Sequence, residues 1–126
     1  MKTLAEKISD SELEVMRVLW EAEDALSVTT IREALQARTG WEATTIKTLI
    51  QRLYKKGIIA QEKRTVFYYR PLLSEKEYND WATQNLIRKL YGGSARNLVA
   101  ALVRSDGLTA EDVAELRALF KVEDDK

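Results

Sequence analysis

The apolar positions along the chain predict three helices followed by a β-hairpin. Apolar residues recur with helical spacing over residues 10–22 and 29–38, with a turn and a short extended piece over residues 23–27 between them. A third helix is expected within WEATTIKTLIQRLYKKG, whose final glycine lies just past the helix end. The period then changes, because IIAQEK and TVFYYR are rich in β-branched and aromatic residues and KRT joins them, which is typical of a hairpin.

Helical spacing returns after the hairpin, over residues 74–90, 94–104 and 110–121, and the final VEDDK is expected to be a frayed acidic tail. Two helix starts carry a capping box, in which a Ser or Thr is followed three residues later by Glu, and a third carries a variant with Asp: Ser9 with Glu12, Ser74 with Glu77, and Thr109 with Asp112. The order of elements predicts a first domain over residues 1–73 and a helical domain over residues 74–126.

The third predicted helix has one apolar and one polar face. The apolar stripe, which is expected to dock on the first two helices, consists of Ile46, Leu49, Ile50 and Leu53. The opposite face carries only side chains that can donate hydrogen bonds: Thr44, Lys47, Thr48, Gln51 and Lys55, flanked by Thr45, Arg52 and Lys56. This helix therefore presents donors and positive charge on one side without an acidic residue.

These residue types are those that read DNA in the major groove. Threonine offers a hydroxyl to base edges and a methyl group to thymine, lysine reaches guanine, and glutamine can pair with adenine. Arg52, Lys55 and Lys56 are expected near phosphates, and Lys63 and Arg64 at the hairpin tip near the backbone or minor groove. The predicted fold is mainly α with a small β-hairpin wing, which is a winged helix-turn-helix followed by a helical dimerisation domain.

The polar face of this helix is also compatible with two roles that do not involve DNA. A polar helix face is usually only solvated, although threonine is a poor helix former and three threonines within residues 44–48 are then an odd choice. The face could also present polar contacts to an acidic protein, as a winged-helix protein-protein interaction module without sequence-specific DNA binding. Retention of random duplex at low salt, with binding that falls steeply as salt is added, would favour DNA.

The distribution of charge favours a polyanionic partner for the region around the third helix and the hairpin. The 126-residue sequence has no net charge, yet residues 47–70 carry seven basic residues and one acidic residue, a net charge of +6. Residues 74–126 carry eight basic and ten acidic residues, a net charge of −2. DNA binding is therefore expected in the first domain and not in the second.

The composition argues against an enzyme and against a membrane protein. The sequence contains no cysteine and no histidine, which excludes thiol catalysis, the commonest general base and Cys/His sites for zinc. We therefore predict no catalytic residue, no cofactor and no metal site. The chain has neither an apolar run long enough to span a membrane nor the apolar core of a signal peptide, so a cytoplasmic protein without a membrane partner is expected.

The helical domain of residues 74–126 is too small to bury a sufficient core alone, so mutual burial with a second copy is expected. The predicted dimer interface consists of Trp81, Leu86, Leu90, Leu98, Leu102, Leu116 and Phe120. A twofold dimer would place two recognition helices on one face of the DNA. The alternative is that these helices pack on the winged helix of the same chain.

The sequence resembles the penicillinase-repressor family, also called the BlaI/MecI family and related to copper repressors of the CopY type, in the stretches ISDSELEVMRVLW, GWEATTIKTLIQRLYKKG, YYRPLLS, YGG and NLVAALVRSDGLTAEDVAELRALF. The resemblance implies a homodimeric repressor of bacterial genes that binds an inverted-repeat operator, commonly with TACA and TGTA elements. It implies DNA contact by Thr44, Thr45, Lys47, Thr48 and Arg52 on the helix and by Lys63 and Arg64 on the wing.

Three departures from the family pattern bear on this expectation. Glu42 stands where the family often has Ser or Thr before the recognition helix, and glutamate is expected to cap weakly. Penicillinase repressors are released by cleavage at an Asn-Phe bond, where this chain has Ala101-Leu102, and copper repressors use Cys-x-Cys pairs, whereas this chain has no cysteine. The resemblance therefore leaves open the release mechanism and any upstream sensor or protease.

Overall fold

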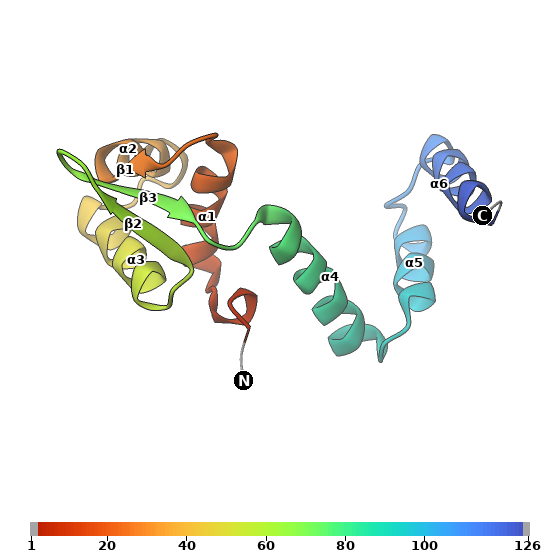
Figure 1. Ribbon diagram of the computed structural model, residues 1–126. Coiled ribbons are helices and arrows are strands. Elements are labelled where there is room, and N and C mark those ends of the chain that lie inside the picture. The colour runs from red at the N-terminus through yellow and green to blue at the C-terminus, as the bar shows by residue number, and fades with distance from the viewer. Residues whose placement is uncertain (1–2, 125–126) are drawn as a thin grey trace. The chain divides into compact units, whose positions relative to one another are not determined.

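The computed structural model describes residues 3–124, with side chains described up to Phe120 (Figure 1). The chain forms two compact units, of which the first ends at Ala82 and the second begins at Thr83. The elements follow in the order η1 (Ala5–Lys7), α1 (Asp10–Glu21), β1 (Leu26–Ser27), α2 (Val28–Thr39), α3 (Ala43–Lys55), β2 (Ile59–Lys63), β3 (Phe67–Pro71), α4 (Glu75–Tyr91), α5 (Ala95–Arg104) and α6 (Ala110–Asp124). The predicted fold class, mainly α with a small antiparallel sheet, is confirmed.

Each predicted capping box is present. Ser9 Oγ accepts a hydrogen bond from the Glu12 backbone N–H at 3.2 Å, and Glu12 Oε1 accepts one from the Ser9 N–H at 2.9 Å. The same reciprocal bonds, at 3.0 to 3.1 Å, join Ser74 with Glu77 and Thr109 with Asp112. These bonds satisfy N–H groups that have no partner within a helix, so α1, α4 and α6 begin where the sequence pattern predicts.

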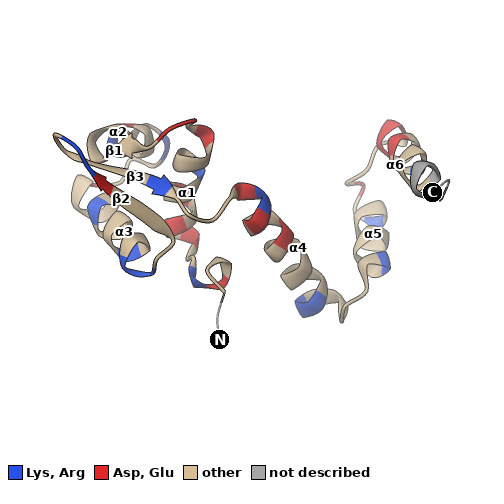
Figure 2. Ribbon diagram, in the orientation of Figure 1, with Lys and Arg blue, Asp and Glu red and all other residues tan. Residues whose placement is uncertain are grey.

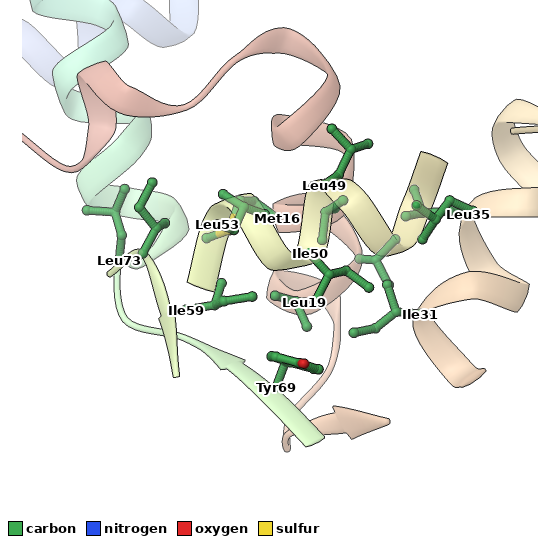
Figure 3. Packing of buried hydrophobic residues seen from close by; sticks show 14 of the residues in the cluster. Met16, Leu19, Ile31, Leu35, Leu49, Ile50, Leu53, Ile59, Tyr69 and Leu73 are labelled. Carbon is green, nitrogen blue, oxygen red and sulfur yellow. The ribbon is translucent and has the colours of Figure 1, made fainter. Parts of the chain in front are cut away.

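The core of the first unit lies between α3, the other two helices and the sheet (Figure 3). The apolar stripe of α3 is buried as predicted: Ile46, Leu49, Ile50 and Leu53. It belongs to one hydrophobic cluster with Met16, Leu19, Ile31, Leu35, Ile59, Tyr69 and Leu73. Because burying an aliphatic side chain contributes roughly 1.5–3 kcal/mol, this stripe fixes the rotation of α3 about its own axis.

A three-stranded antiparallel sheet, in the order β1-β3-β2, completes the first unit. β2 and β3 form the predicted hairpin, with Gln61 opposite Tyr69, and β3 ends at Pro71. The turn is closed by a hydrogen bond from the Arg64 N–H to the Val66 carbonyl at 3.0 Å. The sequence did not predict that β1 pairs with β3, because a two-residue strand carries no periodicity.

The first turns of α4 belong to the first unit. Trp20 on α1 donates its Nε1–H to the Leu73 carbonyl at 2.8 Å, and its ring centroid lies 5.7 Å from that of Tyr78. The Tyr78 ring lies in turn 5.8 Å from Trp81, and both rings pack against the core cluster. The compact unit therefore runs to Ala82, beyond the boundary predicted at residue 73. Trp81, predicted at a dimer interface, packs on the core of its own chain.

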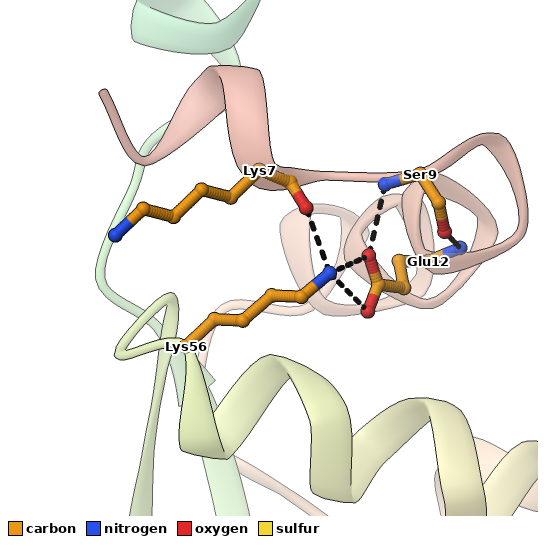
Figure 4. A network of polar contacts seen from close by, with 4 residues as sticks. All are labelled: Lys7, Ser9, Glu12 and Lys56. Atoms are coloured by element: carbon orange, nitrogen blue, oxygen red, sulfur yellow. Dashed lines mark hydrogen bonds and ion pairs between the residues drawn. The ribbon is translucent and has the colours of Figure 1, made fainter. Parts of the chain in front are cut away.

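Lys56, at the C-terminal cap of α3, is paired with a buried carboxylate (Figure 4). Its Nζ lies 2.6 and 2.8 Å from the two Glu12 oxygens and donates to the Lys7 carbonyl at 2.8 Å. Burial raises the pKa of Glu12, but hydrogen bonds from Lys56 and Ser9 and the charge of Lys56 outweigh it, so this pKa lies below its ordinary value. Lys56, which was predicted to lie near DNA phosphates, is therefore paired within the chain, because all three of its donors serve α1 and the segment before it.

The last helix is longer than the sequence analysis predicted. α6 runs to Asp124, whereas the prediction ended it at residue 121 and described VEDDK as frayed. That description is wrong for residues 122–124, which continue the helix, and no glycine or proline is present there to end it. The last two residues of VEDDK lie outside the described residues.

We expect Lys56→Ala to lower the free energy of unfolding by about 1–3 kcal/mol, because it leaves the buried Glu12 carboxylate without its charged partner. The matched control is Lys55→Ala, whose side chain is exposed on the same helix and whose loss is expected to change the free energy by less than about 0.5 kcal/mol. Urea unfolding followed by tryptophan fluorescence measures both. Equally small changes for the two variants would show that the Glu12–Lys56 pair contributes no stability.

Candidate nucleic-acid interface

The polar face of α3 is exposed along its length because the opposite face is buried. All seven residues predicted to contact DNA from this helix are exposed: Thr44, Thr45, Lys47, Thr48, Gln51, Arg52 and Lys55. Glu42 is the N-cap residue and makes no side-chain capping hydrogen bond, as expected for glutamate. The face is therefore a continuous row of donors and cations.

The three threonines of this face differ in how their hydroxyls are used. Thr48 Oγ1 donates a hydrogen bond to the Thr44 carbonyl at 2.9 Å, which leaves the oxygen of Thr48 as an acceptor. Among the described residues, the hydroxyls of Thr44 and Thr45 have no hydrogen-bond partner. Thr44 and Thr45 can therefore both donate to a ligand and accept from it, whereas Thr48 is disposed to accept.

Two further predicted contact residues, Lys63 and Arg64, lie exposed at the hairpin tip. Figure 2 shows basic residues both on α3 and on the loop between β2 and β3. Arg64 is already engaged within the chain, because its Nε and Nη2 donate to the Glu62 carboxylate at 3.3 and 3.2 Å. The positive charge at the wing tip is therefore smaller than a count of its basic residues suggests.

A groove of about 870 Å³ lies between α2, the polar face of α3 and the hairpin. Three cations and two exposed aromatic rings line it: Arg32, Lys47, Lys55, Tyr54 and Phe67. A sugar–phosphate strand is anionic at its phosphates and largely apolar at its sugars. The combination of cations and apolar rings is thus suited to a nucleic-acid backbone.

Three of these groove residues were not among the predicted contact residues: Arg32, Tyr54 and Phe67. Arg32 on α2 also lines a smaller hollow of about 140 Å³ together with Thr44 and Lys47. Its position beside Lys47 depends on how α2 packs on α3, which an apolar pattern does not give. Tyr54 does carry a signal, because it is a large aromatic residue that lies outside the apolar stripe of its helix.

The described part of the chain offers neither a metal site nor a membrane-spanning helix. Among the residues whose side chains are described, from Thr3 to Phe120, no group of three or more histidine, cysteine or acidic side chains is placed to hold a metal ion. Over the same residues, no helix combines the length and the apolar character needed to cross a membrane. The polar face of α3, the hairpin and the groove between them are therefore the candidate site.

The chain matches the family model described as penicillinase repressor over residues 8–122. It belongs to the penicillinase-repressor family. The methicillin resistance regulatory protein MecI of Staphylococcus aureus strain N315 is 38% identical over 115 residues, which cover 90% of this chain and 93% of MecI. The penicillinase repressor of Bacillus licheniformis is 33% identical over 116 residues, which cover 91% of this chain and 90% of that repressor.

Two solved structures of the repressor BlaI match more than half of this family member. The solution structure of the DNA-binding domain of BlaI is 37% identical, with a TM-score of 0.54, and covers 62% of this chain and 94% of that domain. The solution structure of monomeric Bacillus licheniformis BlaI in complex with the blaP half-operator is 38% identical, with a TM-score of 0.50, and covers 56% and 87%. The predicted winged-helix fold and family are confirmed, and because the family consists of repressors, the chain is not an enzyme.

We expect Thr44→Ala and Thr45→Ala each to leave the free energy of unfolding unchanged or to raise it by up to about 0.5 kcal/mol, because both side chains are exposed and alanine is the better helix former. Leu49→Ala, on the buried face of the same helix, is the comparison and is expected to cost about 2–5 kcal/mol. Urea denaturation measures all three variants. A loss above about 1 kcal/mol from either threonine variant would instead give that threonine a structural role.

Proposed function

We propose that this chain is a transcriptional repressor that binds an inverted-repeat DNA operator as a homodimer. The observation that carries the proposal is the exposed row of threonines and cations on α3, opposite a fully buried stripe, in a member of the penicillinase-repressor family. A relative with 38% identity, BlaI, has been solved in complex with the blaP half-operator. The contacting residues, the dimer and the symmetry of the operator are parts of the proposal.

Side chains at the start and in the middle of α3 are proposed to contact the bases. Lys47 has the reach and charge to donate to guanine O6 and N7, and Gln51 can pair bidentately with adenine. The hydroxyls of Thr44 and Thr45, which have no partner among the described residues, can bond to base edges or phosphates. Thr48 offers an acceptor for the exocyclic amino group of adenine or cytosine. This mixture gives the helix a means of distinguishing sequences and not only of attracting DNA.

Cations around the polar face of α3 are proposed to contact phosphates. Arg52 and Lys55 continue α3 toward its C-terminal end, and Lys63 and Arg64 extend from the wing. Arg32 adds a cation from α2 at the wall of the groove. Phosphate contacts orient a protein on the duplex but carry little sequence information, so those of Arg32, Arg52, Lys55 and Lys63 are expected to support cognate and non-cognate binding alike.

The second unit is proposed to supply the dimer interface. Most of the apolar residues predicted there are exposed in the single chain, namely Leu86, Leu90, Leu102, Leu116 and Phe120, with Leu98 half-buried. Within the part of this unit whose side chains are described, only Ile87 among the apolar residues is buried. A second copy would remove this exposed apolar surface from water. Trp81 is excluded from the proposed interface because it packs on the first unit.

Repression by this arrangement requires no chemical reaction. A dimer on promoter DNA obstructs the polymerase, and two half-sites bound together supply an affinity that one half-site lacks. Any event that separates the two copies therefore releases the DNA. The proposal places the protein in the cytoplasm, where bacterial operators are located, and includes no cleavage at Ala101-Leu102, because the Asn-Phe pair is absent there.

We expect Lys47→Ala to weaken binding to a duplex selected from random DNA about tenfold or more, and to weaken binding to its scrambled version much less, because a lysine contact to a base discriminates between sequences. Lys55→Ala is the matched variant. It is expected to weaken binding to both duplexes alike and to reduce the salt slope by about one. Fluorescence anisotropy at several salt concentrations measures these affinities.

The scrambled duplex has the same length and base composition, so it controls for electrostatic attraction. Equal losses on both duplexes for Lys47→Ala would contradict base reading at that position. Failure of the unaltered protein to retain any duplex at low salt would contradict DNA binding altogether and would favour the protein-protein interaction module.

We expect Phe120→Glu to raise the dimer dissociation constant by at least about 30-fold, because it replaces an aromatic anchor by a charge that the interface would have to bury. Ala118→Glu is the control, since it adds the same charge on the opposite face of α6 and is expected to leave the dimer intact. Sedimentation equilibrium measures both constants. A monomeric unaltered protein, or equal effects of the two substitutions, would contradict the proposed interface.

A further inference from the structure

The wing tip contains a cluster of three side chains, Glu62, Arg64 and Tyr68. Glu62 on β2 lies directly opposite Tyr68 on β3 in the strand register, so their side chains share one face of the hairpin. Arg64 reaches this face from the turn and places its guanidinium carbon 4.3 Å from the centre of the Tyr68 ring. A carboxylate in this position is unexpected on a wing that is proposed to approach DNA, because it repels phosphates.

The cluster holds Arg64 in one orientation before any DNA is bound. A long arginine side chain loses rotamer freedom when it is immobilised at an interface, and a side chain that is already held loses less. The ring of Tyr68 is half-buried and therefore provides a fixed support under the guanidinium. Two of the five N–H donors serve Glu62. The other three donors have no partner among the described residues, so they can meet acceptors on DNA.

Glu62 also offsets the charge of Arg64. The hydrogen bonds that Arg64 donates to the Glu62 carboxylate raise the pKa of Arg64 above its ordinary value. The guanidinium is charged and the carboxylate carries the opposite charge, so the pair as a whole is neutral. Binding to non-cognate DNA is almost wholly electrostatic. A neutral pair at the wing tip consequently adds little attraction to DNA in general, while a held guanidinium still serves a duplex that is docked correctly.

We propose that Glu62 is a specificity-determining residue that acts through Arg64. With Tyr68, it holds the guanidinium in the orientation that a correctly docked duplex requires, and its charge suppresses attraction to all other DNA. Glu62 itself makes no contact with DNA in this arrangement and is a positioning residue. The inference rests on the proposed function, since it requires that the wing lies against the operator.

The test is Glu62→Gln, measured against a duplex selected from random DNA and against its scrambled version. Binding to the scrambled duplex is expected to become about three- to fivefold tighter and its salt slope steeper by about one, because Arg64 then acts as an unpaired cation. Binding to the selected duplex is expected to change by less than about twofold, because the lost orientation offsets the gained charge. The ratio of the two affinities therefore falls.

The same substitution in an Arg64→Ala background separates positioning from bulk charge. If Glu62 acts through Arg64, Glu62→Gln will leave the affinity ratio unchanged in that background, as a double-mutant cycle requires for coupled residues. A ratio that falls equally in both backgrounds would overturn the inference, because Glu62 would then act as a general negative charge. Equal tightening on both duplexes in the unaltered background would overturn it as well.

Tyr68 offers a second variant that leaves every charge in place. Tyr68→Leu removes the ring under the guanidinium and is expected to weaken binding to the selected duplex about two- to threefold with little change for the scrambled one. Tyr68→Phe keeps the ring and is expected to behave as the unaltered protein. If the unaltered protein prefers the selected duplex but these ratios do not change, only this inference fails. If it shows no preference, the proposed function fails too.

Discussion

The burial of one stripe of α3 against α1 and α2 is the constraint on which the rest of the structure depends. Ile46, Ile50 and Leu53 leave the helix no freedom to rotate about its axis, so its polar face points outward as a consequence of packing. The same burial supplies the stability that the threonines of that face do not, since helices in proteins depend more on packing than on propensity. Because the buried face stabilises the helix, the exposed face can carry residues that favour recognition over helix stability.

The partners of the basic residues matter more for function than their number. Residues 47–70 carry a net charge of +6, yet Lys56 is held by a buried carboxylate and Arg64 by Glu62. The first pair ties α3 to α1, and the second sits at the wing tip. The attraction that this region exerts on a polyanion therefore comes chiefly from the remaining exposed cations, of which Lys47, Arg52 and Lys55 lie on α3.

Local signals in the sequence were sufficient for the helices, their capping boxes and the two faces of α3, because each depends on residues within a few positions of one another. The features that the sequence did not predict depend on contacts between distant segments. In the sequence Lys56 is simply one more cation, because its contact with Glu12 joins residues that are 44 positions apart. The predicted boundary at residue 73 does not take account of Trp20, whose ring N–H donates to the carbonyl of Leu73, 53 residues later, just before α4. The position of Arg32 in the groove likewise follows from helix packing and not from spacing.

On the proposed function, folding of the second unit, dimerisation and DNA binding are linked equilibria, because each depends on the second copy. Leu90, Val103 and Phe120 are each more than half exposed there, at 63, 55 and 64%. A unit with so little core of its own gains stability from a second copy, so its folded fraction depends on protein concentration. Because a single half-site binds weakly, occupancy of the operator then rises more steeply than concentration does. On the proposed function, release then requires neither a broken peptide bond nor a metal thiolate, since separation of the two copies removes the contribution of the second half-site.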